Sequence, residues 1–527
     1  MSHRSQVDQL RSILDWMSTN TAFKGTNSVH SVPPLLQNFS LSQWTDLINC
    51  LAQGKPPKLD PIKTRIVAQL LAAFARNRMR AADLGSTDPL FPLESLDAFY
   101  HLALTVDNLA AGHCLQVLAL QADEESIRDL ADVLSSNPPE DWRSVAVAMS
   151  PLWHANRDLV EFFFDQLEDG LFQPSSMAVL LDLANYATRN HTLAEHPWME
   201  RSSDLARLLQ TLHIQLEKLQ DNPAKFGNDV DTIQRTLNDA IALTVSLCDA
   251  LGLIGSKDAI PVLREVLELS HRRIQTEAAG ALARLGDDVG AESLIRLASD
   301  RVARARAVAY AEELEIAERI SENLRVPAAL AESELAVWLA SGDQFGFPPT
   351  SMELLDSRTL YWPSFEDPQN CFLFNYVYEI PGQSITNVGL AGPVTHAFQA
   401  NIGKLPLDDI YAAFAGWHAE HDEIYEIPAD QLNTSQLREA DLLAKEFERH
   451  GIQVKRKLAL TFLLGELALL AEVEQAGRHF VGISDGEETF CLPRTTDELG
   501  MGDSVGIGPD IVLHIFRGRK LLRSFNP

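Results

Sequence analysis

Residues 249–267 read DALGLIGSKDAIPVLREVL, and residues 280–298 read GALARLGDDVGAESLIRLA. The second stretch follows the first by 31 residues, and both place an apolar run, a glycine and another apolar run in the same order. Gly255 and Gly286 follow the first apolar run, where glycine commonly ends a helix in the left-handed conformation. Asp258 is suited to begin the next helix. Each copy is therefore predicted to be two helices joined by a glycine turn.

The two helices of each predicted unit carry facing apolar stripes. Leu247 and Leu251 lie on one side of the first helix, and Leu263 and Leu267 lie on one side of the second. A two-helix unit of this size cannot bury both stripes alone, so neighbouring units must stack. The pattern predicts an α-solenoid.

The segment RIQTEAAGALARLG, residues 273–286, is followed by a second helical pattern and resembles a HEAT-like repeat of the phycobilisome-lyase type. The resemblance is clear over residues 243–314, and a third copy begins at Arg301 but departs from the pattern at Tyr310–Leu314. HEAT-like repeats mostly serve as contact surfaces between proteins, and a minority resemble lyases that attach bilins. The resemblance implies a protein-interaction role, with a bilin-lyase-like role as an alternative.

Arg273 and Arg304 occupy matching places one repeat apart. They could form a ladder presented to an acidic partner. In HEAT-like repeats the matching arginine commonly connects neighbouring units, and the forked guanidinium suits such pairing between helices. We expect the stacking role for both residues.

Helical spacing of apolar residues extends from the start of the chain to about residue 330, and then the texture changes. We predict an all-α helical-repeat region at 1–335 and an α+β domain at 350–527, to which no family is assigned. The domain is expected to hold an antiparallel sheet with helices on one side. Its expected hairpins are 371–390, 479–492 and 511–525, and its expected helices are 407–421 and 435–450.

The composition limits the classes of partner. The chain has 527 residues and a formal net charge of −29, so it repels phosphate backbones and anionic membrane surfaces. Its five cysteines form no C-x-x-C pair, and its first residues lack a secretory apolar core. We expect a cytoplasmic protein that binds a protein partner rather than nucleic acid or membrane, with no cofactor motif.

Two histidines in FAGWHAEHDEIYE, residues 414–426, raise the question of a metal site. His418 and His421 could bind zinc together with Asp422 or the distant His396. The spacing H-x-E-H is one residue short of the inverted zinc-protease signature. Both histidines also fall on or beside the predicted apolar face of a helix. We favour histidines packed in that face over a metal site.

A second motif, GISDG at residues 482–486, matches G-x-S-x-G and is followed by Asp510 and His514. Ser484, Asp510 and His514 stand in the order that α/β-hydrolases use for their catalytic triad. The residues after Ser484 are short and strand-like, however, and a nucleophile elbow needs a helix there. A hairpin turn at Asp485-Gly486 is the preferred explanation.

The glycine-rich run at residues 500–508 could cradle a phosphate group, but it lacks a P-loop lysine and precedes the β-prone residues 511–516. We expect a loop that leads into a strand. Taken together, the sequence favours a non-enzymatic interaction or scaffold protein. An enzyme with a metal-dependent or serine-based hydrolytic site in the C-terminal domain is the alternative.

Overall fold

The computed structural model describes residues 107–526 except for 168–174, 222–228, 342–343, 420–424, 464 and 494–506, together with isolated positions between 72 and 104. The chain divides into two compact units, Met1–Ser293 and Leu294–Pro527. The division falls inside the helical region, whereas helices give way to strands between Leu339 and Ser351.

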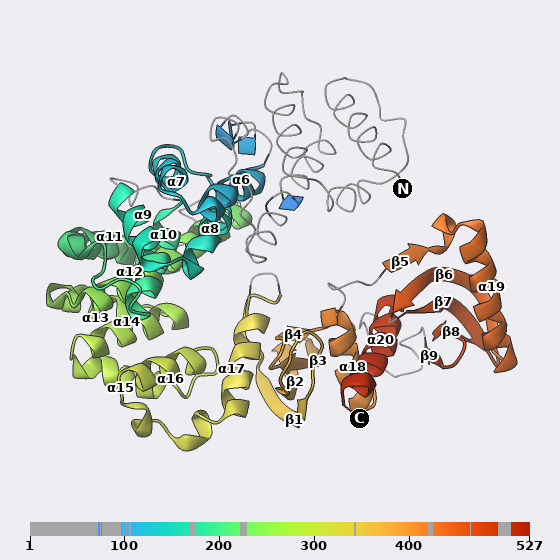
Figure 1. Ribbon diagram of the computed structural model, residues 1–527. Coiled ribbons are helices and arrows are strands. Elements are labelled where there is room, and N and C mark those ends of the chain that lie inside the picture. The colour runs from blue at the N-terminus through green and yellow to red at the C-terminus, as the bar shows by residue number, and fades with distance from the viewer. Residues whose placement is uncertain are drawn as a thin grey trace. The chain divides into compact units, whose positions relative to one another are not determined.

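The described part of the first unit is built from helices (Figure 1). Their bounds are α6 Asn108–Gln121, α7 Glu124–Ser136, α8 Trp142–Met149, α9 Arg157–Gln166, α10 Met177–Arg189, α11 Ser202–Asp221, α12 Val230–Ile254, α13 Ile260–Leu267, α14 Arg272–Arg284 and α15 Asp288–Leu297. Helix α12 packs against both α10 and α14, and α6 packs against α8. The second helices of the pairs, which are α7, α9, α11 and α13, form another row. In this row α7 contacts α9, and α11 contacts α13. The predicted stacking of helical pairs is confirmed.

The predicted glycine turns end the first helices of the repeats. Gly255 has φ 78° and Gly286 has φ 82°, both in the left-handed region that favours glycine. The backbone N–H of Ser256 donates to the carbonyl of Leu251 at 3.2 Å, and that of Asp287 donates to Leu282 at 2.9 Å. These bonds satisfy carbonyls that a helix end leaves without an intrahelical partner. The glycine turn thus fixes the angle at which the second helix starts.

One described helical segment, Ile233–Ile254 in α12, is long and apolar enough to cross a bilayer by length and composition alone. More than half of its most apolar window is buried inside the protein, and core helices of soluble proteins pass the same test. This observation is weak evidence for a membrane span.

The second unit contains two antiparallel sheets and five longer helices among its described residues. The helices are α16 Arg304–Glu313, α17 Pro327–Leu339, α18 Leu407–His418, α19 Thr434–Arg449 and α20 Pro509–Phe525. The first sheet has the order β1 Ser351–Leu360, β2 Gln369–Ile380, β3 Gln383–Ala391 and β4 His396–Ala397. The second has the order β5 Tyr425–Pro428, β6 Gln453–Leu463, β7 Glu466–Gln475, β8 Arg478–Ser484 and β9 Thr489–Pro493.

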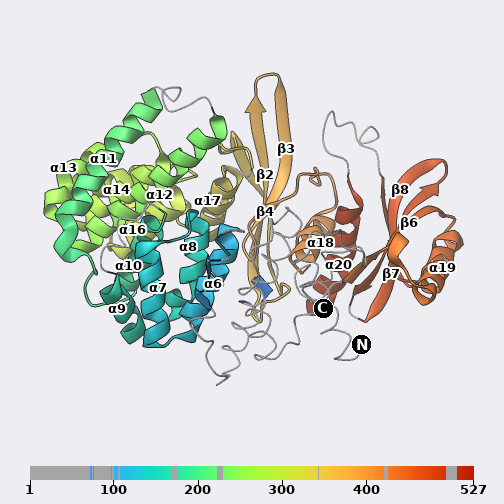
Figure 2. The same ribbon diagram turned by 90° about the horizontal axis from the view of Figure 1, so that it is seen from above.

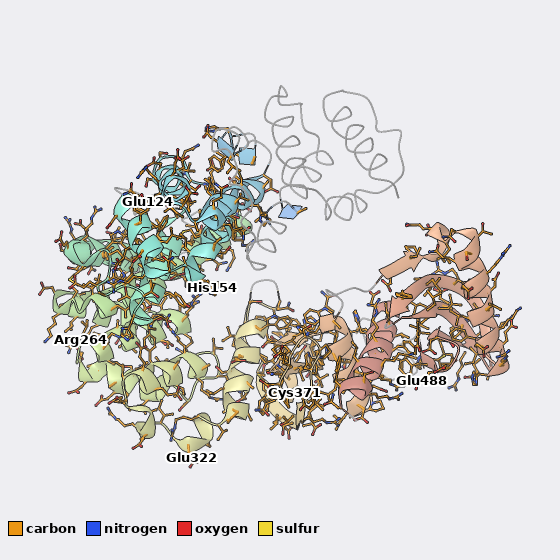
Figure 3. All side chains as sticks on the ribbon, viewed as in Figure 1. Glu124, His154, Arg264, Glu322, Cys371 and Glu488 are labelled. Carbon is orange, nitrogen blue, oxygen red and sulfur yellow. The ribbon has the colours of Figure 1, made fainter. Side chains whose placement is uncertain are left out.

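Helices and sheets alternate in layers within this unit (Figures 1 and 2). Helix α17 covers one face of the first sheet, with Leu335 against Phe374 and Tyr378 in one core. Helices α18 and α20 lie between the sheets in the largest core, which includes Cys371 of the first sheet (Figure 3). Helix α19 covers the far face of the second sheet. Each sheet therefore buries both faces.

Three expectations for this unit were wrong. The predicted α+β domain with antiparallel strands is confirmed, but the expected single sheet with helices on one side is two sheets, each with helices on both faces. The expected hairpin at 511–525 is the helix α20, and the strand expected after the glycine-rich run is the same helix, with Gly508 as its N-cap residue. Residues 500–506 of that run lie outside the described part of the chain. Gly518, in the middle of the expected hairpin, lies where α20 packs closely against α18: a Cβ there would come within 1.7 Å of the Ala412 carbonyl oxygen.

The other local predictions were confirmed. Strands β2 and β3 form the hairpin expected at 371–390, and β8 and β9 form the one expected at 479–492. The helices expected at 407–421 and 435–450 are α18 and α19, with their ends shifted by a few residues. Short-range turn chemistry and apolar periodicity were sufficient for these elements.

Candidate protein-interaction surface

Polar side chains gather along the first helices of the array, on α10, α12 and α14. We call this group the first-helix polar cluster. Its members are Asp182, Asn185 and Arg189 on α10, Ser246 and Asp249 on α12, and Arg273, Glu277 and Arg284 on α14. Asn185, Ser246, Asp249 and Glu277 are buried, whereas Asp182 and Arg273 are exposed. The cluster thus runs from the interior of three stacked helices to their surface.

Asp249 connects the three helices. Only 5% of this residue is exposed, and its carboxylate pairs with Arg189 on α10 and with Arg284 on α14, the latter at 3.4 Å. A buried carboxylate is tolerated when charged hydrogen-bond donors compensate for its lost hydration. Because the two guanidinium groups come from the helices on either side of α12, the ion pairs fix the stacking of neighbouring units.

Further hydrogen bonds extend the cluster. The Asn185 Nδ2 group donates to the Ser246 carbonyl at 3.0 Å, and the Ser246 hydroxyl donates to Asp182 Oδ1 at 2.6 Å. Burial lowers the pKa of His196 to about 4, so its ring is neutral at pH 7. Its Nδ1 accepts from the Trp198 N–H at 3.3 Å, so Nε2 carries the proton and donates to Asn185 Oδ1 at 3.1 Å.

Asp182 has an unusual protonation equilibrium for a surface carboxyl. The surrounding protein desolvates it and raises its pKa to about 6, while the Ser246 hydroxyl and the charge of Arg273 act in the opposite direction. The carboxylates of Asp249 and Glu277 raise the pKa further. Asp182 is therefore an accessible carboxyl on a face that favours its neutral form.

Aromatic side chains lie beside the exposed end of the cluster. Tyr186 is one helical turn from Asp182 and is 37% exposed, and its ring lies 4.8 Å from that of Trp153. Tyrosine, tryptophan and arginine are the residue types that contribute most to binding energy in protein interfaces. Here Tyr186 stands on a helix whose position is held by buried ion pairs, so it offers a rigid contact area.

The two arginines singled out in the sequence lie in different surroundings. Arg273 is exposed on α14, and its charge acts on Asp182. Arg304 is buried, and its guanidinium donates to the carbonyls of Ala298 and Ala329, each at 3.1 Å, and to Glu332 Oε2 at 2.6 Å. Arg304 thus connects α16 to α17 within the second unit.

The candidate metal ligands are described only in part. His396 on β4 stacks on Trp417 with ring centroids 3.8 Å apart, and burial lowers its pKa to about 4. His418 ends α18 and stacks on Phe365 at 6.1 Å. His421 and Asp422 lie outside the described residues. Within the described part of the chain, no group of three or more His, Cys, Asp or Glu side chains could hold a metal ion.

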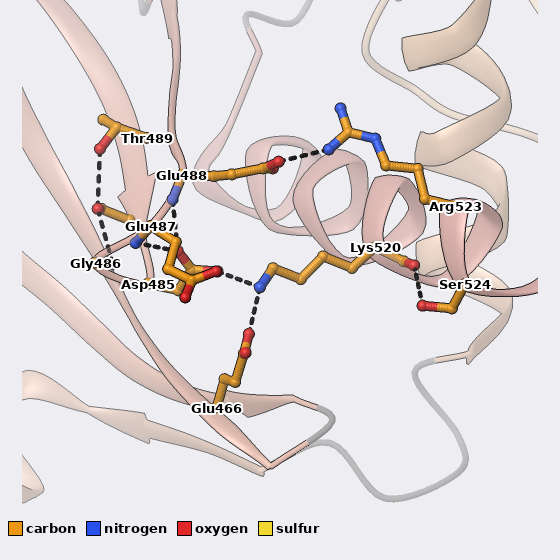
Figure 4. A network of polar contacts seen from close by, with 10 residues as sticks. Glu466, Asp485, Gly486, Glu487, Glu488, Thr489, Lys520, Arg523 and Ser524 are labelled. Carbon is orange, nitrogen blue, oxygen red and sulfur yellow. Dashed lines mark hydrogen bonds and ion pairs between the residues drawn. The ribbon is translucent and has the colours of Figure 1, made fainter. Parts of the chain in front are cut away.

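Ser484 lies at the end of β8 and is fully buried. Its Oγ accepts hydrogen bonds from the Thr489 hydroxyl at 2.9 Å and from the Gly486 N–H at 3.4 Å, so it belongs to the turn between β8 and β9. Asp485 in the same turn pairs with Lys520 of α20 (Figure 4). Asp510 and His514 both lie on α20, where His514 stacks on Phe398. The expected hairpin turn accounts for the G-x-S-x-G pattern.

Sequence reasoning singled out Arg273 but missed the rest of the first-helix polar cluster. Arg189 and Asp249 are 60 residues apart, and no spacing rule connects them. The available signal was Asp249 itself, a carboxylate between the buried residues Leu247 and Leu251 of an apolar helix. A charge on such a face predicts a partner on a neighbouring helix but does not identify it.

Residues 233–314 match the family model of HEAT repeats. The match covers α12, α13, α14, α15 and α16, and so includes the parts of the first-helix polar cluster that lie on α12 and α14. This segment is a HEAT-like repeat segment, and such repeats commonly mediate protein–protein interaction. No curated protein matches the chain.

Proposed function

We propose that this chain is a non-enzymatic scaffold that holds a protein partner on the first-helix polar cluster and the aromatic pair Trp153 and Tyr186. The observation that carries the proposal is the position of Tyr186. Tyr186 is 37% exposed, its ring contacts that of Trp153, and the residue lies between Asp182 and Arg189 on α10. HEAT repeats support the general role, because stacked helical pairs leave an extended surface for contact.

The physical basis is pre-organisation. Asp249 holds α10, α12 and α14 together through Arg189 and Arg284, so the exposed residues are positioned before a partner arrives. Binding then costs less conformational entropy than it would on a mobile surface. A partner that presents an apolar side chain to Tyr186 and a polar group to Asp182 would fit both parts of the surface.

The test compares two variants of the full chain as affinity baits in extracts of the native cell. Tyr186→Ala removes the aromatic anchor, whereas Ile214→Ala changes a residue of α11 with similar exposure, 41%, in the second-helix row. We expect a partner that is retained by the wild type and by Ile214→Ala but is reduced at least about 10-fold with Tyr186→Ala, as the loss of a hot-spot residue predicts.

Cross-linking mass spectrometry of the wild-type complex provides a second readout, because cross-links should map to residues of α10, α12 and α14. Equal recovery of the partner with both variants, or cross-links confined to other helices, would show that the partner does not bind at this surface. Thermal unfolding of both variants is the control for folding, since neither exposed side chain contributes to the core.

A further inference from the structure

The second unit repeats one arrangement twice. The order α17, β1, β2, β3, β4, α18 is followed by α19, β6, β7, β8, β9, α20. In each half the first helix covers the outer face of a meander of strands, and the second helix lies on the inner face (Figure 1). The two inner helices, α18 and α20, pack against each other. The halves are related as the two subunits of a symmetric dimer would be.

The sequences of the halves support this relationship. Residues 388–391 read VGLA in β3, residues 481–484 read VGIS in β8, and all of them are buried. Added to Gly389, a Cβ would come within 2.9 Å of Leu335 in α17, whereas one on Gly482 would come within 2.8 Å of Phe447 in α19. Each glycine thus admits the outer helix of its own half.

The contact between the inner helices is reciprocal. Gly416 lies against the carbonyl of His514, which is four residues before Gly518, and Gly518 lies against the carbonyl of Ala412, which is four residues before Gly416. The same pair of positions therefore meets twice with the helices exchanged. Such reciprocity is the mark of a twofold relationship.

The halves differ at one sheet edge. In the second sheet β5 covers the outer side of β6, with Tyr425 opposite Phe462 and Pro428 opposite Ala459. In the first sheet, the strand that corresponds to β6 is β1, and one edge of β1 pairs with β2. Among the described residues no strand pairs with its other side. Within the described part of the chain, one half of the duplication thus has a covered sheet edge and the other has an open one.

Apolar side chains are exposed along this open edge. Leu354 and Leu355 in β1 are 43% and 45% exposed, and Tyr361 and Phe365, just beyond its end, are 46% and 40% exposed. An edge strand with exposed apolar side chains and unpaired backbone groups is a template for strand pairing. The side chain of Asn526 bonds both the N–H and the carbonyl of Tyr361, so the open backbone ends at Leu360.

We propose that β1 pairs with β1 of a second copy of this chain, antiparallel and centred on Ser357. In that register Asp356 lies opposite Arg358 of the second copy, and Arg358 lies opposite Asp356. Opposite charges at facing positions of neighbouring strands stabilise a pairing. Asp356 and Arg358 lie on one face of the strand, where Arg358 Nε is 2.8 Å from Asp356 Oδ2. Centring on Arg358 instead would place two guanidinium groups opposite each other.

The extent of the pairing follows from the strand itself. A bulge at Leu355 turns Leu354 toward the α17 face, whereas Asp356 and Arg358 lie opposite Leu373 and Cys371 on the inner side. Regular pairing about Ser357 is thus limited to residues 355–359, a span comparable to the contact of β5 with β6. The dimer is independent of the first-helix polar cluster, so either proposal can fail alone.

The first experiment measures the mass of the full chain by light scattering and sedimentation at concentrations up to about 100 μM, because small interfaces are often weak. We expect a concentration-dependent dimer. Ser357→Lys places two ammonium groups opposite each other at the axis, and we expect it to raise the dimer Kd at least about 10-fold. Ser351 is also exposed on β1 but lies outside the proposed pairing, so Ser351→Lys should leave the dimer Kd unchanged.

The second experiment tests the register by oxidation. Ser357→Cys brings two thiols together across the axis and should form a disulfide-linked dimer. In Ser351→Cys the two thiols would lie about 40 Å apart at about 3.4 Å per residue, so no link is expected. The wild-type chain, oxidised in the same way, shows how much dimer is linked through the native cysteines alone. A monomeric wild type, or equal linking of Ser351→Cys and Ser357→Cys, would overturn the proposal.

Discussion

Gly416 of α18 lies so close to His514 of α20 that a Cβ on the glycine would come within 1.9 Å of the His514 carbonyl oxygen. The two helices therefore touch backbone to backbone at the centre of the second unit. This contact joins the cores that each sheet forms with its inner helix, because α18 and α20 share one buried cluster with both sheets. The layered order of the second unit depends on Gly416 and Gly518. From the sequence alone, neither glycine was placed at a contact between helices.

Gly518→Ala should destabilise the protein by about 1–3 kcal/mol or more, because the new Cβ would meet the Ala412 carbonyl oxygen at 1.7 Å. Alanine is the better helix former, so helix propensity acts in the opposite direction. The measurement is chemical denaturation followed by circular dichroism. Gly508→Ala is the control, because nothing lies within 4 Å of a Cβ at that N-cap position. A Gly518→Ala protein as stable as the control would contradict the close helix contact.

Asp182→Asn should raise the free energy of unfolding at pH 7. The folded pKa of about 6 lies above the ordinary value of 3.8, so between these pH values the folded carboxyl keeps a proton that the unfolded chain has released. Stability from this group therefore falls as pH rises from about 4 to 6, and the asparagine variant should lack that decline. Denaturation curves at several pH values between 4 and 7.5 measure how the free energy of unfolding of each protein depends on pH.

Asp204→Asn is the contrasting variant for this titration, because a hydrogen bond from Arg207 lowers the pKa of Asp204. A lowered pKa gives stability that is present at neutral pH and is lost as pH falls through the folded pKa. The two variants should therefore change the pH dependence in opposite directions. An unchanged slope between pH 4 and 6 in Asp182→Asn would refute the raised pKa.

Arg304→Met should destabilise the second unit by about 2–4 kcal/mol, because a buried residue that holds Glu332 and two backbone carbonyls is lost. Glu332 keeps Arg301 as a partner at 2.8 Å, which limits the loss. Arg157→Met removes an exposed pair with Glu161 and should cost less than about 1 kcal/mol. Thermal unfolding of the two variants measures the difference. Similar losses in both would show that Arg304 does not connect α16 to α17.

Ser484 should not react with a serine-directed phosphonate in the native protein, because its side chain is fully buried and its hydroxyl oxygen accepts from Thr489. Ser484→Ala should lose about 1 kcal/mol of stability, the usual contribution of one hydrogen bond. Labelling is followed by intact-protein mass spectrometry. A label on the native chain that disappears in Ser484→Ala would support the hydrolase alternative instead.

The local features of this fold could be predicted because their physical causes are local. Gly255 and Gly286 end helices through their own backbone freedom, and residues 381–382 and 485–488 turn between strands that the adjacent residues already favour. The HEAT-like pairing follows from apolar stripes at helical spacing. None of these features depends on a distant part of the chain.

The candidate surface could not be predicted, because Asp249 meets Arg189 and Arg284 only after three helices have stacked. The sequence by itself determined the helical pairs, their glycine turns and two of the hairpins. The tertiary structure alone decided that residues 511–516 form a helix. That run is buried on every side between two sheets, so its apolar pattern shows neither the period of a helix nor that of a strand.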